Sequence, residues 1–367
     1  MIMFVIAVIA IVAIMQRWSE KNALLGIEYR QESTKKIVEP EESFQLVSTL
    51  TNRSNRFVPF LRVVEVFPAQ AQVLHGQTRL RVDLMGNVKH HYSTYLMPKS
   101  RLERKISLTL PKRGTYYFRG AQIAGGDFLG LREERQNFSG TLEIVVYPKS
   151  APLGHLHEAL GGFMGDVSVR RFIMEDPILT VGVRDYTGRE PLNQISWKHS
   201  ARTNQLQVKQ FDYTVEPMVS ILLDANALDP TKAGDQLLES CYGLVRSVCE
   251  QLERKGISYD FMTNVLPENY RTKKEQYLGK GLGKNHLQKV LEILGRASYF
   301  SAEKLEDTVE KLILKQARNR SAIVVMPERD AAKEKIAHRL KERIGGSLIC
   351  FYGEDCHDVY NRVEKDL

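Results

Sequence analysis

The spacing of apolar residues changes near the middle of this 367-residue chain and separates two kinds of structure. Before about residue 150, stretches such as "FLRVVEVFP" and "GTYYFRGAQIA" alternate apolar and polar side chains, which is the period of a half-buried strand. Turn residues such as Gly86-Asn87 and Gly125-Gly126 separate these stretches. Short strands at this spacing predict an antiparallel β-sandwich-like domain over residues 26–150.

The second half of the chain has a different pattern. "PMVSILLD" is a continuous apolar run that ends at Asp224, as expected of a buried parallel strand. Amphipathic helical patterns then alternate with the strand-like runs "GISYDFMTN", "SAIVVMP" and "SLICFYGED". This alternation predicts a C-terminal α/β domain over residues 216–367, with a parallel sheet between helices. Residues 151–215, Gly-rich at their start, are predicted to connect the two domains.

The first fifteen residues, "MIMFVIAVIAIVAIM", contain no polar side chain. A spanning helix needs about 20 apolar residues, and Arg17 and Trp18 are suited to the interface at its end. A secretory signal peptide, the alternative, would need a basic start and a cleavage site that are missing here. We therefore predict a membrane helix over residues 1–18. Basic residues follow it, so the positive-inside tendency predicts a single-pass protein of the inner membrane with its bulk in the cytoplasm.

Charge and cysteine content exclude several classes of function. The chain has 52 Lys and Arg against 44 Asp and Glu, and the two signs are interleaved, so no nucleic-acid partner is expected. Its four cysteines show no C-x-x-C spacing, which indicates neither a zinc site nor a disulfide framework. "GKGLGK", over Gly279 to Lys284, lacks the Gly and Ser or Thr of a Walker loop, and His286 replaces the third Gly of a dinucleotide fingerprint. A loop that enters a helix is expected there.

Ligands of parallel sheets bind at the carboxyl ends of the strands, which directs attention to Asp224, to 263–264 and to 326–328. A metal-ion-dependent adhesion site needs Asp-x-Ser-x-Ser, because hydroxyl and carboxylate oxygens coordinate a hard cation. This chain has Asp224, Asn226 and Leu228 at those positions, and Leu cannot be a ligand. We therefore predict no cofactor. Asp224 and Asn226 are at most a vestigial pair, and Mg²⁺ is the cation that such a degenerate site would take.

The stretch "GVRDYTGREPLNQISWKHSAR" and the "LQVKQF" that follows resemble the signature of the domain-of-unknown-function-58 family. The matching residues are Arg184, Tyr186, Ile195, Trp197, Ser200, Ala201, Arg202, Leu206, Val208 and Lys209. "KRGTYYFRGAQIAGGDFLGL", from Lys112 to Leu131, is also similar to the family's Lys-Arg-Gly and Asp-Pro-Phe-Gly-Leu elements, with the Pro missing before Phe128.

This resemblance implies an amino-terminal membrane helix, a β-sandwich-like region and a von Willebrand factor A-like α/β domain. Many genes of the family lie beside genes for MoxR-type AAA+ ATPases. The resemblance therefore implies a membrane-anchored interaction or scaffold protein that acts with such an ATPase in protein assembly or maturation.

The signature motif has two interpretations. Arg184, Asp185 and Arg202 could form buried ion pairs that fix the connecting region to the α/β domain, with Trp197 as an apolar anchor. Alternatively, the motif residues Arg184, Asp185, Tyr186, Trp197, Ser200, Ala201 and Arg202 form an exposed recognition surface, since Trp, Tyr and Arg dominate interface hot spots. No catalytic residue is predicted. The competing functions are a hydrolase and a divalent-cation-dependent binding protein, each with its site near Asp224.

Overall fold

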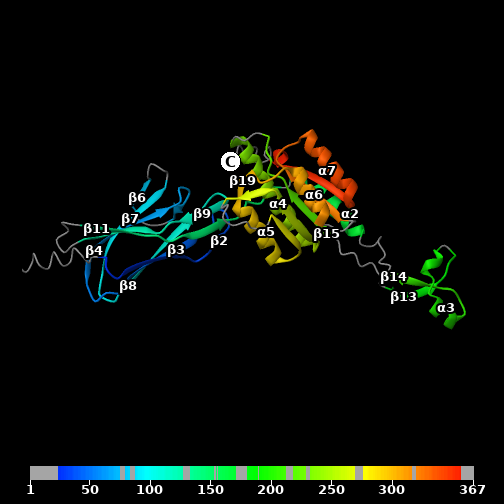
Figure 1. Ribbon diagram of the computed structural model, residues 1–367, viewed down its shortest axis with the longest axis horizontal. Helices are drawn as coiled ribbons and strands as arrows, with labels where there is room; N and C mark the ends of the chain where they lie inside the picture. Colours follow the sequence, from blue (N-terminus) through cyan, green and yellow to red (C-terminus); the bar gives the residue numbers. More distant parts are fainter. Residues whose placement is uncertain are drawn as a thin grey trace, which may run out of the picture. The chain divides into compact units, whose positions relative to one another are not determined.

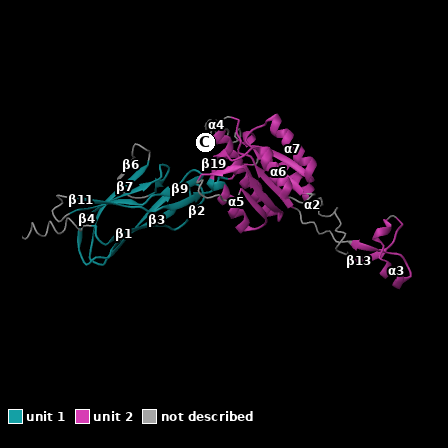
Figure 2. Cartoon of the chain, viewed as in Figure 1, with its two compact units in different colours: residues 1–149, 294–296 teal, residues 150–293, 297–367 magenta. Residues whose placement is uncertain are grey.

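The computed structural model describes residues 24–74, 79–82, 87–126, 133–152, 154, 156–170, 180–188, 190–211, 218–228, 232–268, 276–315 and 320–356. The chain divides into two compact units (Figure 2). The first contains residues 1–149 and 294–296, and the second contains residues 150–293 and 297–367.

The described elements of the first unit before residue 150 are strands, arranged in three sheets (Figure 1). One sheet has the order β1-β3-β8-β5, with β1 (Ile27–Ser33), β3 (Phe44–Asn52), β5 (Gln72–Val73) and β8 (Arg101–Thr109). The second has the order β11-β10-β4-β7-β6, with β4 (Val58–Phe67), β6 (Arg79–Val82), β7 (Val88–Leu96), β10 (Ala121–Gly126) and β11 (Glu133–Phe138). The third has the order β2-β12-β9, with β2 (Ile37–Val38), β9 (Gly114–Phe118) and β12 (Leu142–Val146).

A buried polar group separates two apolar clusters in this unit. On β4, Leu61 and Val63 belong to one cluster and Phe67 belongs to the other. Glu65 lies between them in the same alternating register and is fully buried. Its carboxylate accepts a hydrogen bond from the Tyr29 hydroxyl at 2.8 Å and contacts His90 Nδ1 at 2.9 Å. The buried carboxylate is therefore hydrogen-bonded on both oxygens, as burial of a charge requires.

The central sheet of the second unit has the order β18-β16-β15-β20-β21. Its strands are β15 (Met218–Leu223), β16 (Ser258–Thr263), β18 (Tyr277–Gly281), β20 (Arg320–Met326) and β21 (Gly345–Tyr352). The pairs of β15 with β16, β15 with β20, and β20 with β21 are parallel, and β18 pairs antiparallel with β16. All six residues of β15 are buried, as in a strand covered on both faces. Two short pairs, β17 (Val265–Pro267) with β19 (Ala297–Ser301) and β13 (Thr180–Asp185) with β14 (Gln207–Phe211), lie outside this sheet.

The helices that accompany this sheet are α2 (Leu156–Arg170), α4 (Lys232–Lys255), α5 (Lys284–Arg296), α6 (Leu305–Lys315) and α7 (Ala331–Ile344). A further helix, α3 (Trp197–Thr203), and a 3-10 turn at Leu192–Gln194 belong with the β13–β14 pair. Leu312 of α6 and Leu340 of α7 pack in one core cluster with Leu222 of β15. α7 begins at Asp330, whose side chain accepts from Ala332 N at 3.1 Å, and ends at Gly345 in the left-handed region.

The fold class predicted from the sequence is wrong as stated. It required a transmembrane helix, but none of the helices in the described ranges is both long and apolar enough to cross a membrane. α4, the longest of them at 24 residues, has charged side chains along its length. Residues 1–18, where the spanning helix was expected, lie outside the described residues. The predicted single-pass location in an inner membrane is contradicted by the same finding.

Candidate functional site

The signature motif forms a small structure of its own in the second unit. β13 and β14 pair antiparallel, with Arg184 opposite Val208 and Asp185 opposite Gln207. A bridge between Ile195 and Val208, both buried, holds the segment that leads into α3. This arrangement explains the apolar residues Ile195 and Val208 of the motif, since their buried side chains lie where the segment before α3 meets β14.

Hydrogen bonds fix α3 to the hairpin. The Ser200 hydroxyl donates to Ser196 O at 2.9 Å and accepts from Gln207 N at 2.9 Å. Ser196 N donates to Gln207 O at 2.8 Å, and the Gln207 amide donates to the Asp185 carboxylate. Ser200 and Asp185 therefore have structural roles, because Ser200 joins α3 to β14 and Asp185 joins β13 to β14.

Arg184 forms its ion pair within the motif. Its guanidinium lies 2.6 Å from the Glu190 carboxylate, which also accepts hydrogen bonds from the Thr187 hydroxyl and backbone. The Thr187 hydroxyl first, and Arg184 after it, lower the pKa of Glu190 to about 2. The Arg184 side chain is 49% exposed, and its ion-pair partner Glu190 is a residue of the same motif.

The face of α3 away from the hairpin is exposed. Trp197 is 66% exposed, although its indole is among the largest apolar side chains. Ala201 follows Trp197 by one helical turn, and Arg202 follows Lys198 in the same way. All four are exposed. We call these four residues the Trp197 surface. Tyr186 is half-buried.

A Ser–His pair also occurs in the motif. Ser196 Oγ lies 3.0 Å from His199 Nδ1, a distance at which a histidine can activate a hydroxyl. A hydrolytic triad also needs a carboxylate that orients the histidine. Within the described part of the chain, no acidic side chain contacts His199, so the pair lacks this third group.

The strand-end residues singled out in the sequence do come together. Asp224 follows β15 and is fully buried. Its Oδ1 accepts hydrogen bonds from Asn264 Nδ2 at 2.7 Å, from Asn226 Nδ2 at 2.9 Å and from Asn226 N at 3.1 Å. Asn264 follows β16, so the carboxyl ends of two neighbouring parallel strands supply the group, as the topology predicts. Glu328, after β20, accepts instead from Leu228 N.

Lys333, which the sequence analysis did not single out, completes this network. It extends from α7, is buried, and places Nζ 3.0 Å from Asp224 Oδ2. The same ammonium donates to Asn226 O. The second carboxylate oxygen of Asp224 is thus neutralised by a side chain of the protein itself.

The donor set around Asp224 does not fit a divalent cation. Such a cation needs several oxygen ligands directed at one point. Here an ammonium and two amide groups direct hydrogens at the carboxylate, and Asn226 Oδ1 accepts from the Ser301 hydroxyl. In the ranges that the structure describes, no group of three His, Cys, Asp or Glu side chains is placed to hold a metal. Asp224 and Asn226 are therefore parts of a hydrogen-bond network, and their oxygens are not arranged to coordinate Mg²⁺.

Comparison with known proteins leaves the family open. No family model matches the chain. The uncharacterized protein YeaD of Bacillus subtilis (strain 168) is 23% identical over 164 residues, or 44% of this chain, and the match spans only 39% of YeaD. Among solved structures, a CARDB domain from Pyrococcus furiosus is 16% identical over 33% of this chain and 89% of its own, at a TM-score of 0.22. A type II cohesin domain from Acetivibrio cellulolyticus is 10% identical over 32% and 94%, at a TM-score of 0.26.

TM-scores of this size do not establish a shared fold. The expected von Willebrand factor A assignment finds no support in these comparisons and is not retained. The expected membrane anchor is contradicted, because no helix in the part of the chain that the structure describes is long and apolar enough to cross a membrane.

Proposed function

We propose that this chain is a non-enzymatic interaction protein and that its Trp197 surface binds a protein partner. The observation that supports this most is the 66% exposure of Trp197 on a short helix that hydrogen bonds hold in place. A rigid, exposed Trp supplies a large apolar contact at little cost in conformational entropy, which is the property of an interface hot spot.

The residues beside Trp197 indicate the chemistry of the partner. Lys198 and Arg202 place two positive charges next to the indole. Leu192 and Leu206 of the same motif are also exposed, at 69% and 45%. The partner surface should therefore combine an apolar pocket with acidic residues around it.

We propose a MoxR-type AAA+ ATPase as the partner. This choice is supported by the resemblance of the motif to the domain-of-unknown-function-58 family, whose genes often lie beside genes for such ATPases. The ATPase would change conformation with its nucleotide, so its affinity for the Trp197 surface is expected to differ with and without ATP.

Affinity capture tests the proposal. The full chain is captured from its host with and without ATP, the recovered proteins are identified by mass spectrometry, and the affinity for the purified ATPase is then measured. Trp197→Ala is expected to weaken binding by roughly thirtyfold, since truncation of a Trp hot spot costs about 2 kcal/mol or more.

The matched control is Phe300→Ala, which removes an aromatic side chain that is 64% exposed on β19 and should leave the affinity unchanged. Recovery of no AAA+ ATPase, or equal affinity of the wild type and a folded Trp197→Ala variant, would contradict the proposal.

A further inference from the structure

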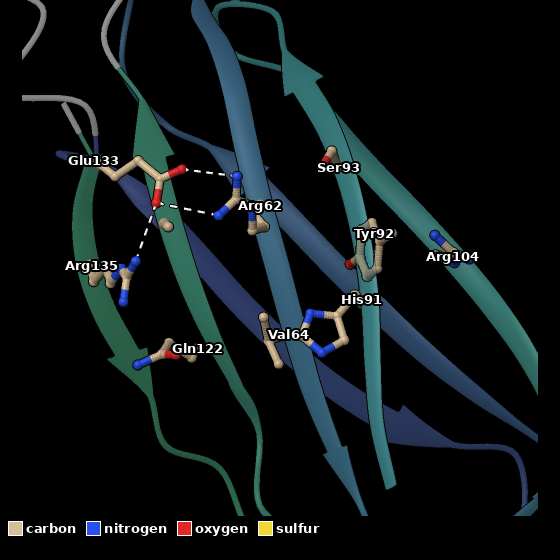
Figure 3. Close-up of a pocket in the computed structure, with 10 residues that line it drawn as sticks. Arg62, Val64, His91, Tyr92, Ser93, Arg104, Gln122, Glu133 and Arg135 are labelled. Atoms are coloured by element: carbon tan, nitrogen blue, oxygen red, sulfur yellow. Dashed lines mark hydrogen bonds and ion pairs between the residues drawn. The ribbon is translucent and has the colours of Figure 1, made fainter. Parts of the chain in front are cut away.

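A hollow of about 860 Å³ lies on the first unit, over the sheet β11-β10-β4-β7-β6 (Figure 3). Its lining includes Arg62, Arg104, Arg135, Glu133, Val64 and Ala124. The volume is in the range of a ligand site. The function proposed above does not use this part of the chain.

Strand register explains why most of these side chains share one face. Ala124 of β10 is opposite Arg62 of β4 on one side and Arg135 of β11 on the other. Residues opposite one another in antiparallel strands point to the same face of a sheet. The small Ala124 side chain between two arginines leaves room above the sheet, and Val64, two residues after Arg62, continues the same face.

The hollow has an excess of positive charge. Three of its lining residues are arginines, and Glu133 is its single carboxylate. Glu133 is shared between Arg62, at 3.1 Å, and Arg135, at 3.5 Å, as the dashed lines in Figure 3 show. The two arginine side chains are 47% and 64% exposed, and ion pairs of this kind contribute about 0–1 kcal/mol. A carboxylate from outside can therefore replace Glu133 at little cost.

The third arginine, Arg104, is positioned by contacts with side chains of β7. The Arg104 guanidinium lies 4.2 Å from the centre of the Tyr92 ring and donates to His90 Nε2 at 3.3 Å. His90 in turn contacts the buried Glu65 at 2.9 Å. Arg104 belongs to β8, which is a strand of the sheet β1-β3-β8-β5. It lines the hollow at the end opposite to Arg135 of β11. A guanidinium whose position is already fixed loses little entropy when it binds an anion.

The distance across the strands sets the size of the ligand. From β11 to β7 the sheet has three strand spacings, which amounts to roughly 14 Å. An extended peptide advances about 3.3 Å per residue, so four or five residues span this distance. In such a peptide, side chains two or four residues apart point to the same side.

We propose that this hollow binds an extended acidic segment of a partner protein, four or five residues long. A carboxylate at one end of the segment pairs with Arg62 and Arg135 in place of Glu133. A second carboxylate, at the other end, pairs with Arg104. Arginine is suited to this role because its planar fork of donors matches a carboxylate at two points.

Peptide binding to the purified full chain tests the proposal. Fluorescein-labelled hexaglutamate is titrated by fluorescence anisotropy at low ionic strength, beside hexaglutamine and hexalysine. Hexaglutamate is expected to bind, the other two peptides are not, and the affinity for hexaglutamate should fall as salt is added. Inorganic phosphate and vesicles with anionic lipid are added as competitors, because phosphate groups also pair with arginine.

Variants locate the binding. Arg62→Gln with Arg135→Gln should weaken hexaglutamate binding by roughly tenfold or more, and Glu133→Gln should strengthen it by roughly threefold because it frees both guanidinium groups. Arg101→Gln is the control, since Arg101 is exposed on β8 and does not line the hollow.

The proposal is overturned if hexaglutamate does not bind, or if the double variant binds it as the wild type does. It is also overturned if phosphate or vesicles displace the labelled peptide at a lower concentration than unlabelled hexaglutamate. These results are independent of Trp197, so they test the hollow separately from the proposed partner surface.

Discussion

At the scale of single residues, the Asp224 carboxylate shows how this chain neutralises a buried charge. Three hydrogen bonds reach Oδ1, and the Lys333 ammonium lies 3.0 Å from Oδ2. Hydrogen bonds and an opposite charge together offset the hydration that a carboxylate loses on burial. Lys333 has the charge-balancing role that a bound cation would otherwise have.

Lys333→Met is therefore expected to lower the free energy of unfolding by about 3–5 kcal/mol, the usual cost of leaving a buried charge without its partner. Adding Asp224→Asn to Lys333→Met should restore part of this loss, because the remaining amide is neutral. Urea unfolding of the two single variants and the double variant measures the coupling. Lys335→Met, on the exposed face of the same helix, is the control and should change stability by less than about 0.5 kcal/mol. A coupling energy near zero would show that the ion pair has no role in stability.

The sequence allowed half of this network to be predicted. Asp224 and Asn264 follow apolar strands, and strand ends of a parallel sheet meet at one edge. Lys333 was missed because "KEKIAHRLKER" contains several lysines and arginines of ordinary solvent-exposed type. The signal that could have found it is its spacing from the buried Ala337 and Leu340, which places Lys333 on the apolar stripe of α7.

At the scale of elements, the connection of β18 with α5 explains the "GKGLGK" sequence. A Cβ on Gly281 would lie 2.2 Å from the His286 ring, so only glycine permits the histidine to pack there. Gly283 has a φ of +100°, which side chains rarely adopt. His286 Nε2 donates to Tyr259 O at 3.0 Å, and this bond ties the first turn of α5 to β16. The glycines thus serve a helix–strand contact. The sequence predicted a loop here, but Gly279 to Gly281 form the end of β18, and only Leu282 and Gly283 connect it to α5.

This contact should make stability depend on pH. Burial first, and the charge of Lys289 as well, lower the pKa of His286 below its ordinary value, against the opposing effects of Tyr259 O and Glu253. Below about pH 6.5 the unfolded chain then binds a proton that the folded chain resists, so the contribution of His286 to stability is present above that pH and declines as the pH falls.

An NMR titration should place the midpoint of His286 below about pH 6.5. His286→Gln, which keeps a donor for Tyr259 O, should lose less stability between about pH 7 and pH 5 than the wild type. His338→Gln, at an exposed position of α7, should behave as the wild type. A His286 midpoint at or above about 6.5 would contradict the prediction.

Boundaries of strands were less predictable than their existence. "GTYYFRGAQIA" has the period of one strand, yet it forms β9 and β10 in different sheets. The break is at Gly120, with a φ of +83°, where a Cβ would lie 2.1 Å from Phe138 O. The only sign of this long-range contact in the sequence is the glycine itself. A single glycine within a strand pattern does not by itself show that the strand ends there. By contrast, the strand predicted over "PMVSILLD" is found as β15, because a continuous apolar run ending in Asp has few alternatives.

At the scale of the whole molecule, the two units have separate cores. The clusters around Leu46 and around Leu61 consist of residues from the first unit, and the cluster around Leu222 consists of residues from the second. The change of hydrophobic period in the sequence reflects this division, since each unit buries a different kind of element. The Trp197 surface and the basic hollow could not be predicted in the same way, because exposed Trp and Arg side chains leave no periodic signal.

Separate cores predict separate unfolding. Leu222→Ala removes a fully buried side chain from the second unit and should cost about 2–5 kcal/mol. Amide hydrogen exchange read by mass spectrometry is expected to accelerate in β15, β16 and β20 and to stay unchanged in β3, β4 and β8, because local stability follows the core to which an element belongs. Leu46→Ala, in β3 of the first unit, is the reciprocal variant and should give the opposite pattern. If either variant accelerates exchange equally in both sets of strands, the two units unfold as one cooperative block.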